Sequence, residues 1–102
     1  MIDPLQVSVV IPVFNEELVL HEFYPRLKKE AESWGKSYEL LFVDDGSTDR
    51  SFDLICEWKK TDSNLSVVKL TRNFGQQAAV LAGFRQSRGD IVVQIDSDLQ
   101  NP

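Results

Sequence analysis

The chain has 102 residues, of which 42% are hydrophobic and 26% are charged, and its formal net charge at pH 7 is −5. This length allows one small domain, and the composition is that of an ordinary globular chain. The negative charge argues against a general binding surface for nucleic acid or for an anionic membrane.

The N-terminal third of the chain predicts a strand followed by a helix. The apolar run at 7–11 is rich in β-branched residues, as in strands covered on both faces. The wider apolar stretch at 7–14 is interrupted by Pro12 and no basic residue precedes it, so it is not a signal peptide. Asn15 would be the N-cap of the helix and Gly35 its stop. The helix has one apolar stripe, formed by Leu20, Phe23, Tyr24, Leu27, Ala31 and Trp34. His21 falls one position off the stripe, which predicts a surface position.

The rest of the chain predicts three more strands with two helices between them. The strands are the apolar runs at 38–43, 65–70 and 91–95. The first of these helices begins near Ser47 or Thr48. It contains Cys56, the only cysteine of the chain, among apolar residues, which predicts a buried and unreactive thiol. The other helix runs over about 75–87. It offers a small-residue surface for close packing on the sheet, formed by Ala78, Ala79, Ala82 and Gly83.

The order of elements is βαβαβαβ, which right-handed crossovers fold into a parallel α/β sheet with helices on both faces. No run approaches the ~18 apolar residues of a membrane span. The last strand would have nothing beside it, and an uncovered strand edge invites pairing with another chain. We therefore expect a parallel sheet that can form a homo-oligomer through this edge.

Ligands of an open parallel sheet bind where the strands end, so the residues after each strand are the candidate site. Pro12, Phe14 and Asn15 follow the first strand. Phe14 either offers a ring face to a ligand or belongs to the core, in which case Asn15 only caps the helix. The chain has neither the G-x-G-x-x-G turn of dinucleotide-binding folds nor the G-x-x-x-x-G-K-[ST] phosphate loop.

Asp44 and Asp45 follow the second strand, and successive side chains of a strand point to opposite faces. One carboxylate can then accept a hydrogen bond from a base or a ribose while the other braces the turn. The alternative for Gly46 and Ser47 is a plain turn, because Asp-Gly-Ser sequences are common in loops.

Arg72, Asn73 and Gly75 follow the third strand. Arg72 either meets a phosphate or an acidic side chain, or stays solvated. Gly75 lets the backbone come close to a ligand where the third helix starts.

Asp96 and Asp98 follow the fourth strand, one residue apart. Carboxylates in this relation can converge on one hard divalent cation, and such a cation is well placed to neutralise a diphosphate. Asp98 and Gln100 are the predicted ligands of Mg²⁺ or Mn²⁺.

Together, the four strand ends resemble those of an inverting family 2 glycosyltransferase with the GT-A fold. The matching segments are 9–17, 42–49, 72–76 and 96–102. The last two are similar to the branch that transfers a sugar to a polyprenyl phosphate, which includes dolichol-phosphate mannose synthase and undecaprenyl-phosphate sugar transferases. Ser97 stands where this family usually has alanine.

The resemblance implies two sets of ligand-binding residues. The nucleotide-binding set is Pro12, Phe14, Glu16, Asp44, Asp45, Arg72, Asn73, Gly75 and Asp96. The metal-binding set is Asp96, Asp98 and Gln100, with Mg²⁺ or Mn²⁺ as the cofactor. Within the first set, Asp45 would line the base and ribose pocket and Asp44 would support it.

The implied reaction is a metal-assisted transfer of a sugar, with inversion, from a UDP- or GDP-linked donor to undecaprenyl or dolichyl phosphate. The family's acceptor-binding half and later catalytic residues correspond to sequence beyond Pro102. We therefore expect 1–102 to be the nucleotide-sugar-binding part of a Rossmann-like GT-A domain, cut after its Asp-x-Asp motif and inactive alone. The full-length protein would act on the cytoplasmic side of the inner or plasma membrane.

Two alternatives belong to other functional classes. A phosphotransferase of the haloacid-dehalogenase type also places Asp-x-Asp after a strand, but it needs a Thr or Val shortly afterwards, and the motif opens that domain. The second alternative is a non-catalytic chain that only binds nucleotide or self-associates. Titration of UDP and GDP with Mn²⁺ against an Asp98→Ala variant separates it from a retained donor site.

Overall fold

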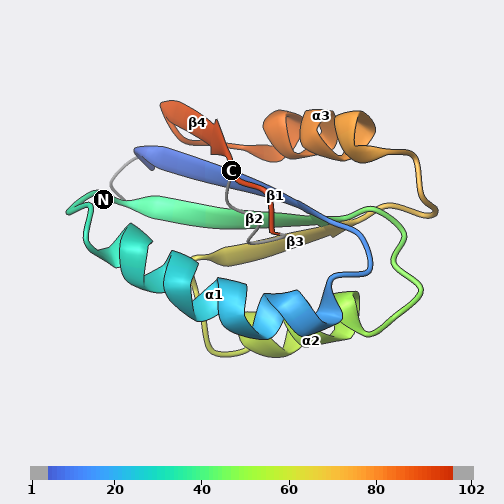
Figure 1. Ribbon diagram of the computed structural model, residues 1–102. Coiled ribbons are helices and arrows are strands. Elements are labelled where there is room, and N and C mark those ends of the chain that lie inside the picture. Colours follow the sequence, from blue (N-terminus) through green and yellow to red (C-terminus); the bar gives the residue numbers. More distant parts are fainter. Residues whose placement is uncertain (1–4, 98–102) are drawn as a thin grey trace.

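The computed structural model describes residues 5–97, which form a four-stranded parallel sheet and three helices (Figure 1). The strands are β1 (Val7–Val13), β2 (Tyr38–Asp44), β3 (Leu65–Lys69) and β4 (Ile91–Gln94). The helices are α1 (Glu17–Glu32), α2 (Ser51–Lys59) and α3 (Gln76–Gln86). Strands and helices alternate along the chain, so the predicted βαβαβαβ order is confirmed.

The strands lie in the order β3-β2-β1-β4, and every neighbouring pair is parallel. β1 and β2 occupy the centre, and every residue of both is buried, as their continuous apolar runs predict. The register pairs Val13 with Asp44 and Val10 with Gln94. Because the strands are parallel, the segments after all four strands emerge at the same edge of the sheet.

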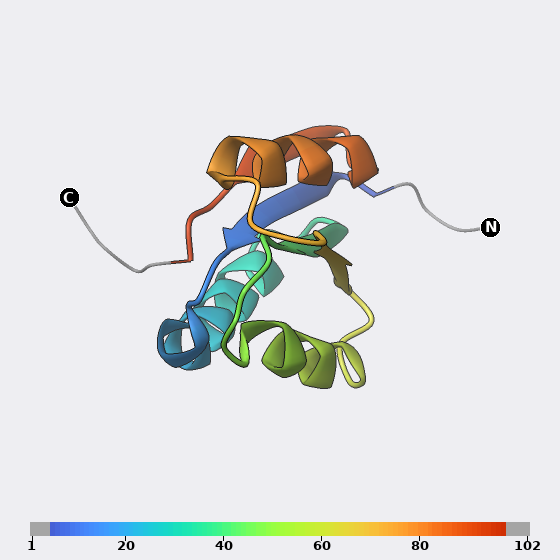
Figure 2. The ribbon, with the colours of Figure 1, turned by 90° about the vertical axis from the view of Figure 1, so that its right-hand side faces the viewer.

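Helices cover both faces of the sheet, as predicted, with α1 and α2 on one side and α3 on the other (Figure 2). Alternate strand residues such as Ile11 and Phe42 belong to the larger core under α1 and α2. Their neighbours Val10 and Val43 pack against α3. A Cβ on Gly83 would lie 2.4 Å from Val10 Cγ1, so the small-residue surface of α3 is what lets this helix approach the sheet.

Three local predictions differ from the structure. The N-cap of α1 is Glu16 and not Asn15, whose φ of 52° turns its side chain towards another loop. α2 begins at Ser51, later than the predicted start near Ser47 or Thr48, because the preceding residues bond to the β1–α1 loop. Cys56 is half-buried and not fully enclosed.

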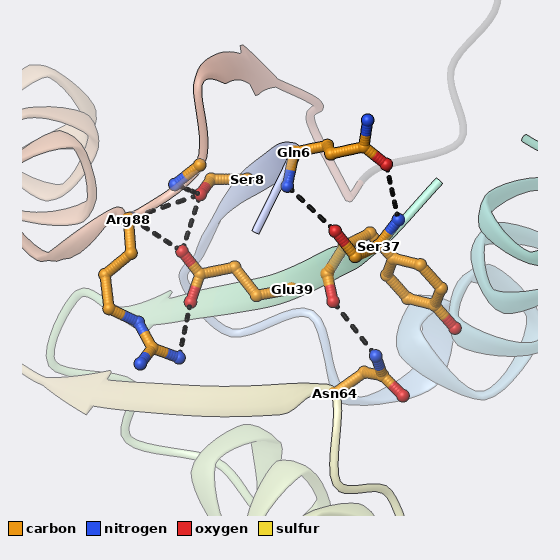
Figure 3. A network of polar contacts seen from close by, with 8 residues as sticks. Gln6, Ser8, Ser37, Glu39, Asn64 and Arg88 are labelled. Carbon is orange, nitrogen blue, oxygen red and sulfur yellow. Dashed lines mark hydrogen bonds and ion pairs between the residues drawn. The ribbon is translucent and has the colours of Figure 1, made fainter. Parts of the chain in front are cut away.

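A buried carboxylate holds the α3–β4 connection at the amino end of the sheet (Figure 3). Glu39 on β2 accepts hydrogen bonds from Ser8 Oγ at 2.5 Å and from the Arg88 backbone N–H at 2.8 Å. Ser8 Oγ in turn accepts from the Gly89 N–H at 2.7 Å. A Cβ on Gly89 would lie 2.7 Å from Ser8 N, so this turn sits directly on β1. These contacts fix where β4 begins, and therefore where its other end lies.

A second buried carboxylate, Asp62, ties α1 to the turn before β3. It accepts hydrogen bonds from Tyr24 Oη at 2.5 Å and from Lys28 Nζ at 2.9 Å, and its Oδ1 also accepts from the Asn64 N–H at 2.9 Å. Burial works to raise the pKa of the Asp62 carboxyl, but these hydrogen bonds outweigh it and hold the pKa below its ordinary value. The ionised form of Asp62 therefore stabilises the fold.

β4 is an edge strand in the described part of the chain, and its apolar residues are open to solvent. Ile91 is 54% exposed and Val92 is 38% exposed. The N–H groups of Ile91 and Ile95 donate to the carbonyls of Gln6, just before β1, and of Val10 in β1, so by strand alternation the backbone groups of Val92 and Gln94 face outwards. The uncovered last strand is as predicted, whereas its pairing with another chain stays a prediction.

Candidate functional site

A pocket lies at the edge of the sheet where the strands end. It is lined by Pro12, Val13, Phe14, Glu16, Asp45, Gln76, Asp96 and Ser97. These residues come from the ends of β1 and β2, the first residue of α3 and the segment after β4. Five of the nine residues predicted to bind nucleotide are therefore gathered around one cavity, although they lie far apart in the sequence.

Phe14 is a wall of this pocket and not part of the core. Its side chain is 43% exposed, whereas Pro12 and Val13 before it are buried. The interpretation of Phe14 as a core residue is therefore wrong. An aromatic ring with a free face at the end of a strand can stack on a planar ligand group such as a nucleobase.

Asp45 is buried at the pocket and holds the start of α3. Its Oδ1 accepts from the Phe74 N–H at 2.8 Å, and its Oδ2 accepts from the Gly75 N–H and from Asn73 Nδ2, both at 3.1 Å. A carboxylate is stabilised by the positive end of a helix dipole. Asn73 and Gly75 thus contact Asp45, and the Phe74 and Gly75 N–H groups already have an anionic partner.

Asp44 lies in the turn and not in the pocket lining. It is completely buried, and its Oδ2 accepts from the Ser47 N–H at 3.1 Å. Its Oδ1 has no hydrogen-bond partner within the described residues. The two adjacent aspartates are therefore separated as strand alternation predicts, with Asp45 at the pocket and Asp44 bracing the turn.

The loops after β2 and β3 are packed directly against each other. Gly46 has a φ of 74°, and a Cβ there would lie 2.4 Å from Arg72 C and from Asn73 N. Only glycine fits both this conformation and this contact. Arg72 is exposed outside the pocket lining, with its guanidinium 4.6 Å from the centroid of the Phe74 ring. Arg72 is therefore not one of the residues that line the pocket.

The loops after β1 and β2 are also joined, through Asn15 and Asp49. Asn15 Oδ1 accepts from the N–H groups of Thr48 at 2.8 Å and of Asp49 at 3.3 Å. Asp49 accepts from the Ser51 N–H at 2.9 Å and from the Glu17 N–H at 3.3 Å. Burial works to raise the pKa of Asp49, but these hydrogen bonds outweigh it and lower the pKa. Asn15 therefore joins the loops that follow β1 and β2, a role that its position before a helix did not indicate.

Asp96 stands at the pocket with its carboxylate held by two glutamine side chains. Its Oδ1 accepts from Gln76 Nε2 at 3.1 Å and from Gln94 Nε2 at 3.0 Å. Sequence analysis assigned neither glutamine a role, although Gln76 ends the matching segment 72–76, and Gln94 lay within a run predicted only as a strand. Ser97 beside it is buried, and its Oγ donates to the Pro12 carbonyl at 3.5 Å, which ties the end of β4 to the end of β1.

Only part of the predicted metal site falls within the described residues. Asp98 and Gln100 lie outside them, so their placement stays a prediction. Between residues 5 and 97, no group of three or more His, Cys, Asp or Glu side chains could hold a metal ion. Of the predicted metal-binding set, Asp96 is the member that lies within the described residues.

A family model described as Glycosyl transferase family 2 matches residues 8–102. The chain is 47% identical over 98 residues to an uncharacterized glycosyltransferase of Bacillus subtilis, YkcC, which covers 96% of this chain and 30% of that protein. It is 53% identical over 97 residues to an undecaprenyl-phosphate 4-deoxy-4-formamido-L-arabinose transferase of Pseudomonas paraeruginosa, which covers 94% of this chain and 29% of that protein. The chain thus spans about 30% of the length of these relatives.

Two solved structures share the fold. The mannosyltransferase PcManGT from Pyrobaculum calidifontis, in complex with GDP-Man and Mn²⁺, superposes with a TM-score of 0.79 at 25% identity, over 95% of this chain and 30% of that one. TarS residues 1–349 from S. aureus, in complex with UDP-GlcNAc, superposes with a TM-score of 0.78 at 28% identity, over 92% of this chain and 27% of that one.

Proposed function

Because the chain belongs to glycosyl transferase family 2, we propose that it forms the part of a glycosyltransferase that binds the nucleotide-sugar donor. The observation that carries this proposal is the pocket at the carboxyl ends of the strands, with Phe14, Asp45 and Asp96 in its lining. Ligands of open parallel sheets bind at this edge. Family membership also excludes the phosphotransferase of the haloacid-dehalogenase type.

The pocket offers the groups that a nucleoside diphosphate needs. The exposed face of Phe14 would stack on the base, and the carboxylates of Glu16 and Asp45 would accept from ribose hydroxyls or from a base N–H. PcManGT is in complex with GDP-Man and TarS with UDP-GlcNAc, so both uridine and guanosine donors are candidates.

Asp96, Asp98 and Gln100 would hold a divalent cation. Asp96 fits this role because it is an exposed carboxylate at the pocket and its Oδ2 has no hydrogen-bond partner among residues 5–97. Oxygen ligands suit both Mg²⁺ and Mn²⁺, and PcManGT is in complex with Mn²⁺. When bound, the cation would neutralise the charge of the diphosphate.

The acceptor that we propose is a polyprenyl phosphate, because one of the relatives is an undecaprenyl-phosphate transferase. A phosphate oxygen of the lipid would attack the anomeric carbon while the bond from that carbon to the diphosphate breaks. The bonding electrons leave with the nucleoside diphosphate, and the configuration inverts. Because the chain spans about 30% of its relatives, we expect the acceptor-binding and catalytic residues in the remaining part and no transfer by 1–102 alone.

The full-length protein would work on the cytoplasmic side of a membrane, where a nucleotide sugar and a lipid phosphate can meet. The described part of the chain contains no helix that is both long and apolar enough to cross a bilayer.

The proposal is tested by calorimetric titration of UDP and GDP into the chain, with Mn²⁺ and with EDTA. We expect metal-dependent binding of at least one nucleotide, lost in Asp98→Ala and kept in Asp90→Ala, whose exposed carboxylate precedes β4 at the other end of the strand. Absence of binding by the unaltered chain contradicts a donor site. Turnover with a polyprenyl phosphate and a nucleotide sugar would contradict inactivity of the chain alone.

The exposed edge of β4 favours a second candidate, self-association of the chain. Val92 and Gln94 direct their backbone groups outwards, and Ile91 and Val92 are exposed beside them. Val92→Pro would remove one outward N–H without touching the ladder to β1, whereas Val92→Thr would keep it. We expect a dimer in light scattering that Val92→Pro abolishes, and a monomeric mass at every concentration contradicts this.

A further inference from the structure

Two amide side chains from different elements converge on one oxygen of Asp96. Gln76 is the first residue of α3 and Gln94 is the last residue of β4. Their Nε2 atoms lie 3.1 Å and 3.0 Å from Asp96 Oδ1. Because α3 and β4 are separate elements, this contact depends on the tertiary fold and not on local sequence alone.

The two donors leave the carboxylate with one available oxygen. A carboxylate oxygen has two lone pairs, and the two amides occupy those of Oδ1. Asp96 Oδ2 has no partner among residues 5–97, and the exposed Asp96 side chain lies in the lining of the pocket. Oδ2 is therefore the oxygen that a ligand in the pocket can reach.

Gln76 also connects Asp96 to Asp45, the buried carboxylate of the pocket. Asp45 binds the N–H groups of Phe74 and Gly75, immediately before Gln76. The backbone from which the Gln76 side chain extends is thus fixed by a hydrogen-bonded anion at the helix start. A side chain anchored in this way loses less freedom when it holds a partner than one on a mobile loop.

We propose that Gln76 and Gln94 are positioning residues, which orient the Asp96 carboxylate so that Oδ2 alone meets the donor nucleotide. This inference rests on the proposed function. The group that Oδ2 meets is either a ribose hydroxyl, which donates a hydrogen bond, or a divalent cation on the diphosphate. Both need a single, fixed carboxylate oxygen, and neither glutamine has to touch the ligand.

The test uses near-isosteric variants that lack the amide. We compare Gln76→Met, Gln94→Met and the double variant with Gln77→Met, whose side chain lies one residue along α3 and makes no hydrogen bond to Asp96 in the described part of the chain. Nucleotide affinity is measured by calorimetry for UDP and GDP, at low and at saturating Mn²⁺, after circular dichroism has confirmed that each variant is folded.

Either amide alone can hold Oδ1, so we expect each single variant to weaken binding by about threefold or less and the double variant by about tenfold or more. A loss of affinity that a higher Mn²⁺ concentration restores identifies the cation as the partner of Oδ2, and a loss that persists at saturating Mn²⁺ identifies the ribose hydroxyl. The proposal would be overturned if the double variant bound nucleotide as tightly as the unaltered chain. It would also be overturned if the fold-loss of affinity in the double variant equalled the product of the fold-losses in the two single variants.

A ligand-free measurement separates this inference from the proposed function. In ¹⁵N spectra, the side-chain amide signals of Gln76 and Gln94 should shift in Asp96→Asn, and that of Gln77 should not. Unchanged Gln76 and Gln94 signals would overturn the positioning role even if nucleotide binds. Shifted signals in a chain that binds neither nucleotide would overturn the proposed function, and the ligand role of Oδ2 with it.

Discussion

Replacement of Glu39 by alanine should destabilise the fold far more than removal of the arginine that pairs with it. Glu39 is 4% exposed and accepts hydrogen bonds from Ser8 Oγ and from the Arg88 backbone N–H. The Arg88 guanidinium is 3.6 Å from Glu39 Oε1, but its side chain is 72% exposed. Arg88→Ala removes only this solvent-screened ion pair and keeps the backbone N–H.

The expected magnitudes follow from these contacts. A hydrogen bond to a charged group contributes about 1.5–3 kcal/mol, and Glu39→Ala removes two of them and leaves the Arg88 N–H with only its longer hydrogen bond to Ser8 Oγ, at 3.3 Å. Because the chain relaxes and water enters, we expect a loss of about 3–4 kcal/mol in the free energy of unfolding. For Arg88→Ala we expect a loss of less than about 1 kcal/mol, as for exposed ion pairs.

Urea denaturation followed by fluorescence of Trp34 and Trp58 measures both values, because both indoles pack against the core. Equal destabilisation by Glu39→Ala and Arg88→Ala would show that the guanidinium is the important partner, and would refute the reasoning from burial. A Glu39→Ala variant as stable as the unaltered chain would show that the α3–β4 turn needs no anchor on β2.

Three further predictions concern packing, acid and the ligand. Gly83→Ala should cost about 1–3 kcal/mol in urea denaturation, because its Cβ would lie 2.4 Å from Val10 Cγ1, and an unchanged midpoint would contradict this close approach. The folded-state pKa of Asp62 is lowered, so its stabilisation is present above the ordinary pKa of 3.8 and is lost as the pH falls through that value towards the lower folded pKa. The free energy of unfolding should depend less on pH between pH 5 and pH 2 in Asp62→Asn than in the unaltered chain. An identical slope of this free energy against pH would contradict a lowered pKa of Asp62. Phe14→Ala should weaken nucleotide binding by roughly tenfold, since stacking on an aromatic ring contributes about 1–3 kcal/mol per base, whereas the exposed Phe84→Ala should have no effect in the same titration.

The elements and the edge that carries the site could be predicted because their signals are local. Apolar runs of β-branched residues mark all four strands, and parallel topology then brings the segments after them to one edge. Pro12, Phe14 and Asp45 could be assigned to a common pocket on this argument alone, and the structure gathers them there.

The contacts between loops could not be predicted, because they depend on which loops lie side by side. Asn15 has the sequence context of a helix cap, yet its Oδ1 binds N–H groups 33 and 34 residues further along the chain. The partners of Asp45 lie 28 to 30 residues away, and nothing near them in sequence marks them as partners of a carboxylate. Gln76 and Gln94 were assigned no role for the same reason.

The length of β4 sets the distance between two anchors, one before the strand and one after it. Before β4, the Gly89 N–H donates to Ser8 Oγ, and after its end the Asp96 carboxylate accepts hydrogen bonds from Gln76 and Gln94. An inserted residue between the anchors would advance the chain by about 3.3 Å and turn every later side chain to the opposite face of the sheet. Asp96 would then point away from the pocket, so this segment should tolerate substitution far better than any change of length.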